Sequence, residues 1–171
     1  MTKAPLPSLL AAAPFLVLLA ACSSEVTDAD EIADFADSDP SAAAPAEISQ
    51  RQDTLEGIGD SFKAIRGQLE AGTPDFTVIE ASATDINRRA NELEGLFPEG
   101  TGRDAGWDTE ALATIWERPD EFAAAHQKLL DESATMMTVA GTGDAAAVGE
   151  QVKALGGACK NCHDDFRLDD D

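Results

Sequence analysis

Three residues near the C-terminus have the types and the spacing that bind an iron porphyrin. Cys159, Cys162 and His163 lie in the pentapeptide Cys-Lys-Asn-Cys-His. In such a CxxCH motif the two thiols form thioethers with the haem vinyl groups, and the histidine ligates the iron. A thioredoxin-like redox pair would need a βαβ pattern, and a zinc site would need a second pair of ligands; the sequence indicates neither. We therefore expect one covalent haem c with His163 as the axial ligand.

The face of the iron opposite His163 has few protein groups that could ligate it. Beyond residue 21 the chain has one other histidine, His126, and two methionines, Met136 and Met137. The methionines follow His126 by about ten residues on one expected helix, roughly 15 Å from the haem level at 1.5 Å per residue. Leu55 cannot ligate iron, so its place on an inward stripe predicts a five-coordinate, high-spin iron under an apolar cover. His126 is the alternative sixth ligand, although its apolar neighbours favour an outward position.

The elements that must position these groups are helices. Apolar residues recur every three or four positions in four stretches separated by glycine and proline, and this period predicts amphipathic helices. The stripes are Ile48, Leu55, Ile58, Phe62, Ile65 and Leu69; Ile79, Ala83, Ile86, Ala90, Leu93 and Phe97; Phe122, Leu129 and Met136; and Val148, Val152, Leu155, Cys159, Cys162 and Phe166. No strand-like alternation competes. We predict an all-α fold, an antiparallel up-down-up-down four-helix bundle over residues 47–171.

The N-terminal part has the composition of an export signal followed by a tether. Residues 1–21 carry one charge, Lys3, and an apolar run too short to span a bilayer. The run ends in Leu19-Ala20-Ala21-Cys22, which resembles a bacterial lipobox and predicts lipidation of Cys22; an ordinary signal peptide with an incidental cysteine is the alternative. Residues 22–46 are acidic and poor in large apolar side chains, so we expect a flexible tether.

The charge of the chain excludes one class of partner. Its 171 residues include 33 Asp and Glu against 12 Lys and Arg, a formal charge of −21. Loss of residues 1–21 would remove Lys3 and leave 11 basic residues, for a charge of −22. Phosphate backbones repel such a protein, so we expect no nucleic-acid binding, and a charged redox partner is expected to be basic.

Several separated segments resemble cytochrome c′, a class II c-type cytochrome, over about residues 47–171. They are Arg51-Gln52 with Leu55, the segment Leu96 to Thr101, Ile115-Trp116-Glu117 with Pro119 and Phe122, and Cys159 to Arg167. The resemblance implies that Leu55 covers the distal side of the haem and that Arg167 stands beside the axial histidine. It also implies that Arg51 and Gln52 lie near the haem propionates, and that Glu110 is near the haem. Arg51 and Arg167 could equally be solvated charges at helix ends.

The resemblance and the residues together predict a gas-binding and electron-transferring protein. Low-spin relatives have a methionine at the position of Leu55, so we expect a high-spin haem that binds nitric oxide or carbon monoxide and exchanges single electrons. The alternative is a six-coordinate, low-spin electron carrier. We expect no enzymatic activity, because the first stripe offers no acid–base group. We further expect a periplasmic location in a Gram-negative bacterium, with a lipid anchor in the membrane; pairing of two copies through the first two helices stays open.

Overall fold

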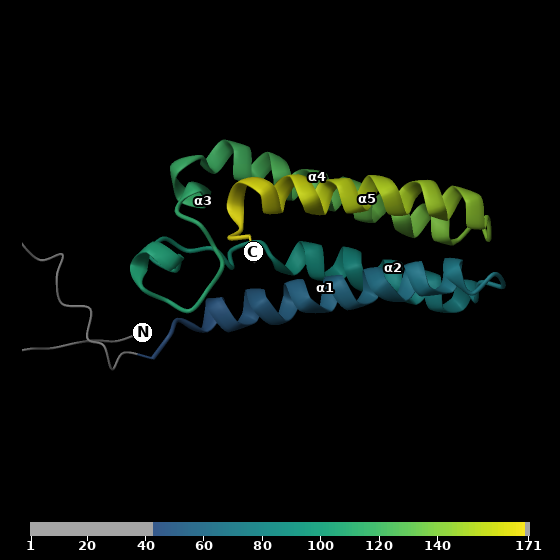
Figure 1. Ribbon diagram of the computed structural model, residues 1–171, viewed down its shortest axis with the longest axis horizontal. Helices are drawn as coiled ribbons and strands as arrows, with labels where there is room; N and C mark the ends of the chain where they lie inside the picture. The colour runs from purple at the N-terminus through teal and green to yellow at the C-terminus, as the bar shows by residue number, and fades with distance from the viewer. Residues whose placement is uncertain (1–42, 170–171) are drawn as a thin grey trace, which may run out of the picture. The chain divides into compact units, whose positions relative to one another are not determined.

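The computed structural model of the chain describes residues 43–169, which form four long helices in two layers (Figure 1). The long helices are α1 (Ala46–Glu70), α2 (Phe76–Glu92), α4 (Pro119–Ala140) and α5 (Ala145–Phe166). A short helix, α3 (Thr114–Glu117), and a 3₁₀ turn, η1 (Arg103–Ala105), lie between α2 and α4. Within residues 43–169 the β-type pairing is limited to one bridge between Ala111 and Arg167. The predicted all-α four-helix bundle is confirmed.

The bundle consists of two antiparallel helix pairs. α1 packs against α2 and α4 packs against α5, while α2 and α4 join the two layers. α1 and α5 run in opposite directions in Figure 1 and contact each other over a short stretch. At this contact a Cβ atom added to Gly156 of α5 would lie 3.3 Å from Cζ of Phe62 of α1. The contact fixes which residues of α1 and α5 stand opposite each other.

Short polar residues and a proline begin three of the long helices. The Asp75 carboxylate accepts a hydrogen bond from the backbone N–H of Thr77 at 2.9 Å, and Asp144 caps α5 in the same way. Pro119 occupies the first turn of α4, where its missing N–H has no role in the helix. An aspartate cap such as Asp75 or Asp144 contributes about 1 kcal/mol to the stability of the protein. The Asp144 cap also fixes where α5 begins, and so the height of every side chain along it.

The second helix is shorter than its apolar stripe predicts. The stripe extends to Phe97, but α2 ends at Glu92, and Gly95 follows in a left-handed conformation with φ +80°. A β-carbon is unfavourable in that conformation, so glycine lets the chain turn there. Leu93 is nevertheless buried in the core, and Phe97 packs against it. The apolar spacing continues beyond the end of α2 because side chains in the following turn also pack in the core.

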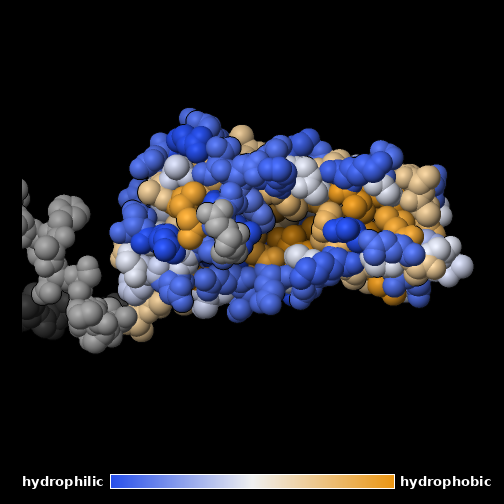
Figure 2. All heavy atoms as spheres, in the orientation of Figure 1, coloured by the Kyte–Doolittle hydropathy of each residue, from blue (hydrophilic) through white to orange (hydrophobic). Residues whose placement is uncertain are grey.

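The described residues bury two hydrophobic clusters. The larger fills the middle of the bundle and includes Ile58, Ile65, Ile79, Ile86, Met136 and Leu155. The smaller joins Ala111, Ile115 and Phe166, with Phe122 and Cys162 packed against it. Leu55, which is 37 % exposed, and Cys159 belong to neither cluster. Figure 2 shows hydrophobic residues in a hollow between the layer of α1 and α2 and the layer of α4 and α5.

The predicted export signal, the predicted lipidation site Cys22 and most of the predicted tether lie outside the described residues. The first described helix begins at Ala46. No helix within residues 43–169 combines the length and the apolar character that a membrane crossing needs.

Candidate functional site

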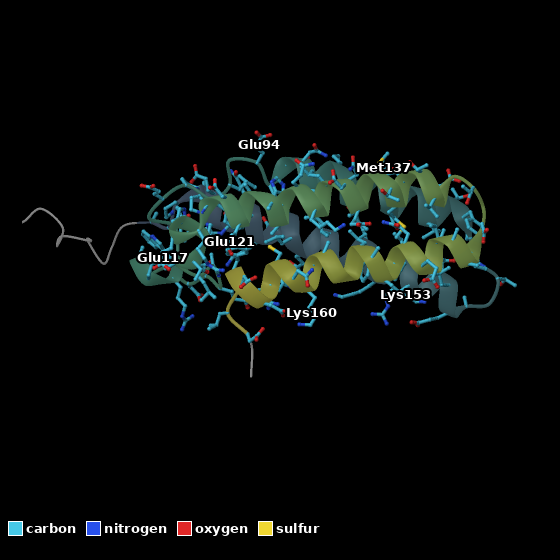
Figure 3. All side chains as sticks on the ribbon, turned by 90° about the horizontal axis from the view of Figure 1, so that it is seen from above. Glu94, Glu117, Glu121, Met137, Lys153 and Lys160 are labelled. Carbon is cyan, nitrogen blue, oxygen red and sulfur yellow. The ribbon has the colours of Figure 1, made fainter. Side chains whose placement is uncertain are left out.

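The last turns of α5 carry the three residues of the CxxCH motif. Cys159, Cys162 and His163 are all half-buried, whereas Lys160 and Asn161 between them are exposed. Figure 3 shows the Lys160 side chain pointing away from the bundle. Residues three and four apart share one face of a helix. The two thiols and the imidazole therefore lie on the side of α5 that faces the bundle, as the sequence predicts.

Backbone pairing holds the end of α5 in place. The N–H of Leu112 donates to the carbonyl of Phe166 at 3.1 Å, and the N–H of Leu168 donates to the carbonyl of Glu110 at 2.8 Å. The N–H of Arg103 donates to the other side of this strip, at the carbonyl of Ala111, at 2.9 Å. The segment of residues 110–112 thus runs antiparallel beside residues 166–168, immediately after the motif.

This pairing brings together two residues that are 57 positions apart in sequence. Nε of Arg167 donates to Oε2 of Glu110 at 2.5 Å. The hydrogen bond from Arg167 lowers the pKa of Glu110. Both charges also act on the His163 imidazole, Arg167 lowering its pKa and Glu110 raising it. The sequence singled out both residues near the haem but contained no sign that they form an ion pair.

The protonation states of the motif suit thioether formation and iron ligation. Burial raises the pKa of the Cys159 thiol. Burial, together with the charges of Cys159 and Asp165, raises the pKa of Cys162 to about 11. Both thiols are therefore protonated at neutral pH, unlike the reactive thiolate of a redox CxxC pair. Burial lowers the pKa of His163, so its imidazole is neutral and has a free lone pair for a metal.

α1 supplies the opposite wall of the site. From the contact between Phe62 and Gly156, Leu55 lies seven residues toward the start of α1, and His163 lies seven residues toward the end of α5. Because the two helices are antiparallel, both residues are roughly 10 Å along the bundle from that contact, at about the same height. Leu55 is one of the two large hydrophobic side chains among residues 43–169 that are exposed. The wall opposite His163 is thus aliphatic at this height.

Arg51, one turn before Leu55, is buried and holds the loop after α2. The side chain is 2 % exposed and donates to Oγ1 of Thr101 and Oγ1 of Thr109, both at 2.8 Å. It also donates to the carbonyl oxygen of Thr101 and lies 5.2 Å from the centre of the Phe97 ring. Desolvation lowers its pKa. Within the described part of the chain no salt bridge involves Arg51, so its charge is buried among neutral partners.

Gln52 stands beside Arg51 but is exposed. Its Nε2 donates to the carbonyl of Asp108 at 3.3 Å, in the loop that Arg51 also holds. The resemblance to cytochrome c′ implies that both residues lie near the haem propionates. Their contacts with residues 101–109 were not predictable, because nothing in the sequence relates α1 to this loop.

The other potential iron ligands are occupied or remote. Nε2 of His126 lies 2.8 Å from the carbonyl oxygen of Ala90, so this ring nitrogen ties α4 to α2. Met136 is fully buried in the larger cluster. Met137 is 39 % exposed on α4, away from the bundle interior (Figure 3). Within residues 43–169 no set of three or more His, Cys, Asp or Glu side chains is arranged to hold a metal ion.

The residues present fit a covalently bound haem. The walls at Leu55 and Cys159 are apolar and packed into neither core cluster, which suits a flat hydrophobic macrocycle. Two protonated thiols and a neutral imidazole share one helix face, as two vinyl groups and an iron require. Among the described residues the buried guanidinium of Arg51 has only neutral partners, and a carboxylate such as a propionate would complement its charge.

Comparison with known proteins gives consistent matches. The sequence profile of a family described as Cytochrome C′ matches residues 46–167. The chain is 35 % identical over 126 residues to a cytochrome c′ of Pararhodospirillum photometricum, covering 74 % of this chain and 99 % of that protein. It is 37 % identical over 131 residues to a cytochrome c′ of Rhodospirillum rubrum, covering 75 % and 86 %. A solved cytochrome c′ from Rhodobacter spheriodes superposes with a TM-score of 0.69 at 27 % identity, covering 75 % of this chain and 100 % of that one.

Proposed function

The chain belongs to the cytochrome c′ family, whose members carry a single covalent haem c, and we propose that it keeps a five-coordinate haem that binds nitric oxide or carbon monoxide and exchanges single electrons. The observation that carries the proposal is the pairing of Leu55 with His163 at one height on facing walls. An aliphatic side chain cannot donate a lone pair, so this wall offers the metal no protein ligand.

Each residue of the motif has one task in this proposal. Cys159 and Cys162 anchor the cofactor through two thioethers, and the neutral imidazole of His163 ligates the metal. The bound haem supplies an iron that takes up a small gas or changes its charge by one electron. Arg167 stands at the end of the same helix and biases the His163 imidazole through its charge, which Glu110 partly balances.

Leu55 selects what reaches the distal side. Its side chain presents only methyl groups, so a water molecule or an anion entering there would lose hydrogen bonds without replacement. A small neutral gas has no such cost. We propose no enzymatic activity, because the methyl groups of Leu55 cannot move a proton to or from a molecule bound at the distal side.

Arg51 and Gln52 are proposed to bind the propionate groups at the edge of the haem. Arg51 carries a buried charge without a carboxylate partner in the described part of the chain, and it lies one helical turn from Leu55. Gln52 is on the same helical turn, and its side chain donates a hydrogen bond to the loop of residues 101–109. A propionate at this edge would be attracted to a buried cation that water screens only weakly.

Absorption spectra of the purified protein in the ferric and ferrous states, with and without nitric oxide, test the proposed function. We expect a high-spin, five-coordinate spectrum that changes when nitric oxide or carbon monoxide is added. A six-coordinate, low-spin ferric spectrum would overturn the proposal. If that spectrum became high-spin in His126→Ala, the alternative of a low-spin carrier ligated by His126 would be established instead.

Cytochromes c′ are periplasmic proteins of Gram-negative bacteria, and we propose the same location here with a lipid anchor at Cys22. The proposal rests on the sequence Leu19-Ala20-Ala21-Cys22. We expect the full chain in the membrane fraction and a Cys22→Ser variant in the soluble periplasmic fraction. An unchanged distribution would reject lipidation. The charge of −21 supports a basic redox partner, whose association rate would fall as salt is added.

A further inference from the structure

A recess lies between α3 and the segment of residues 99–104, at the end of the bundle where α5 ends (Figure 1). Its volume is about 290 Å³. The residues that line it are Glu99, Gly100, Asp104, Ala113, Trp116 and Glu117. None of them belongs to α1 or α5, the two helices that carry Leu55 and the CxxCH motif. The recess is therefore distinct from the walls proposed to hold the haem.

Trp116 forms the apolar wall of the recess. Its indole Nε1 donates a hydrogen bond to the carbonyl oxygen of Phe97 at 3.1 Å. The ring also packs closely on Gly102, where an added Cβ atom would lie 2.5 Å from Cζ3 of the indole. The indole is thus fixed by the loop after α2, and its half-buried ring presents its remaining surface to the recess.

Three carboxylates surround this indole. Glu99, Asp104 and Glu117 are exposed, and within residues 43–169 none of them forms an ion pair. By contrast, the two aspartates that follow His163 are both paired with basic side chains. Figure 3 shows Glu117 at the end of the bundle where α5 ends. Unpaired carboxylates beside an aromatic ring favour a cation, which both kinds of group attract.

Packed side chains connect the recess to the CxxCH motif. Trp116 and Cys162 both pack against the smaller hydrophobic cluster. The centre of the Phe122 ring lies 5.3 Å from that of Phe166 and 4.9 Å from that of Phe97, whose carbonyl holds the indole. Electrons tunnel more readily through packed side chains than across solvent. A molecule seated in the recess would therefore be coupled to a haem attached at Cys162.

We propose that this recess is the docking point for a lysine or arginine side chain of a basic redox partner protein. The inference rests on the proposed electron exchange and assigns the partner a place on the surface. In the transfer the partner gains the single electron that the ferrous haem loses, and no bond forms or breaks. The charge of −21 attracts a basic protein to the whole molecule, and the recess selects one orientation.

Stopped-flow oxidation of the ferrous, haem-loaded full chain tests the proposal. The oxidant is tris(phenanthroline)cobalt(III), which is cationic and aromatic, and pentalysine is the competitor that represents the basic side chains of a partner. Glu117→Gln removes one carboxylate from the recess. Glu80→Gln is the matched control, because Glu80 is also exposed and without an ion pair in residues 43–169, but lies near the start of α2 at the other end of the bundle.

We expect Glu117→Gln to slow oxidation by the cobalt complex about threefold at low salt, and Glu80→Gln to slow it much less, because Coulomb attraction falls with distance and screening. Pentalysine is expected to slow oxidation of the unchanged protein more than that of Glu117→Gln. Ferricyanide, an anionic oxidant, is expected to react no more slowly with Glu117→Gln, and the thermal midpoints are expected to agree.

Two results would overturn the docking site. One is equal slowing by Glu117→Gln and Glu80→Gln, which would mean that only the total charge matters. The other is competition by calcium chloride that equals competition by pentalysine at the same ionic strength, which would make the recess a metal-cation site. Either result leaves the proposed gas binding intact, because the spectra with nitric oxide or carbon monoxide decide that function separately.

Discussion

Replacing Arg51 by alanine is expected to destabilise the bundle strongly, because this side chain links α1 to a loop about 50 residues away. The guanidinium is 2 % exposed and makes three hydrogen bonds to Thr101 and Thr109. The alanine variant loses all three and leaves the Thr101 carbonyl without this donor in a buried place. It also removes the cation from the Phe97 ring, 5.2 Å away.

The size of the expected loss of stability follows from the number of hydrogen bonds that Arg51 makes and from the charge of this donor. A hydrogen bond to a charged group contributes about 1.5–3 kcal/mol to stability. Part of this loss is returned, because the variant no longer buries a cation that lacks a carboxylate partner among the described residues. We expect a net loss of about 3 kcal/mol in the free energy of unfolding, which lowers the thermal midpoint by roughly 10 °C. Thr109→Val removes one acceptor and is expected to cost about 1–2 kcal/mol.

Urea unfolding followed by circular dichroism measures these differences in the haem-loaded protein. Arg66→Ala is the matched control, since Arg66 lies on the same helix, is 56 % exposed and pairs with Glu70 at 3.6 Å. A surface pair of this kind contributes about 0–1 kcal/mol. If Arg51→Ala changes stability no more than Arg66→Ala does, the loop is not held by the buried guanidinium, and the reasoning from its contacts is refuted.

Three further predictions concern other parts of the bundle. Burial alone would raise the pKa of Asp85, but hydrogen bonds from Arg88 and Arg89 hold it at about 2. Its native pKa is thus depressed, so Asp85→Asn is expected to cost about 1–2 kcal/mol at pH 7, and urea unfolding should show this difference shrinking as the pH falls from about 4 toward 2. His126→Ala is expected to leave the ferric spectrum unchanged and to cost about 1 kcal/mol, because the imidazole bonds a carbonyl of α2. Met136→Ala empties a fully buried site and is expected to cost about 2–5 kcal/mol in the same unfolding assay, whereas a loss below 1 kcal/mol would contradict its place in the core.

The helices and the motif on α5 were predictable because both are local in sequence. A period of three and four residues marks a buried helix face, and Cys159, Cys162 and His163 lie within five consecutive positions. The end of α2 was not predictable from its stripe, since Phe97 contributes to the core from a loop. The periodic spacing of apolar residues shows which positions are buried, but a buried residue need not lie in a helix.

The long-range contacts of the site were not predictable at all. Arg51 meets Thr101 and Thr109 in the loop after α2, and Arg167 meets Glu110 where residues 110–112 pair with residues 166–168. The partners in each contact are far apart in sequence and belong to no periodic pattern, so the sequence does not indicate that they meet. The resemblance to cytochrome c′ singled out Arg51, Glu110 and Arg167, and the structure adds which partners they have.

The strip that pairs residues 110–112 with residues 166–168 has a consequence for how the protein can evolve. Its two hydrogen bonds, at Leu112 and Leu168, join backbone atoms, so they depend on chain geometry and not on side-chain identity. Leu112 and Leu168, together with the charged Glu110 and Arg167, can therefore be exchanged while the end of α5 stays in place, whereas Ala111 and Phe166 are also buried in the smaller hydrophobic cluster. Proline at position 112 or 168 is the exception, because it has no N–H to donate. The surface beside His163 is therefore free to diversify, and lineages could change the charges around the haem without moving the motif that holds it.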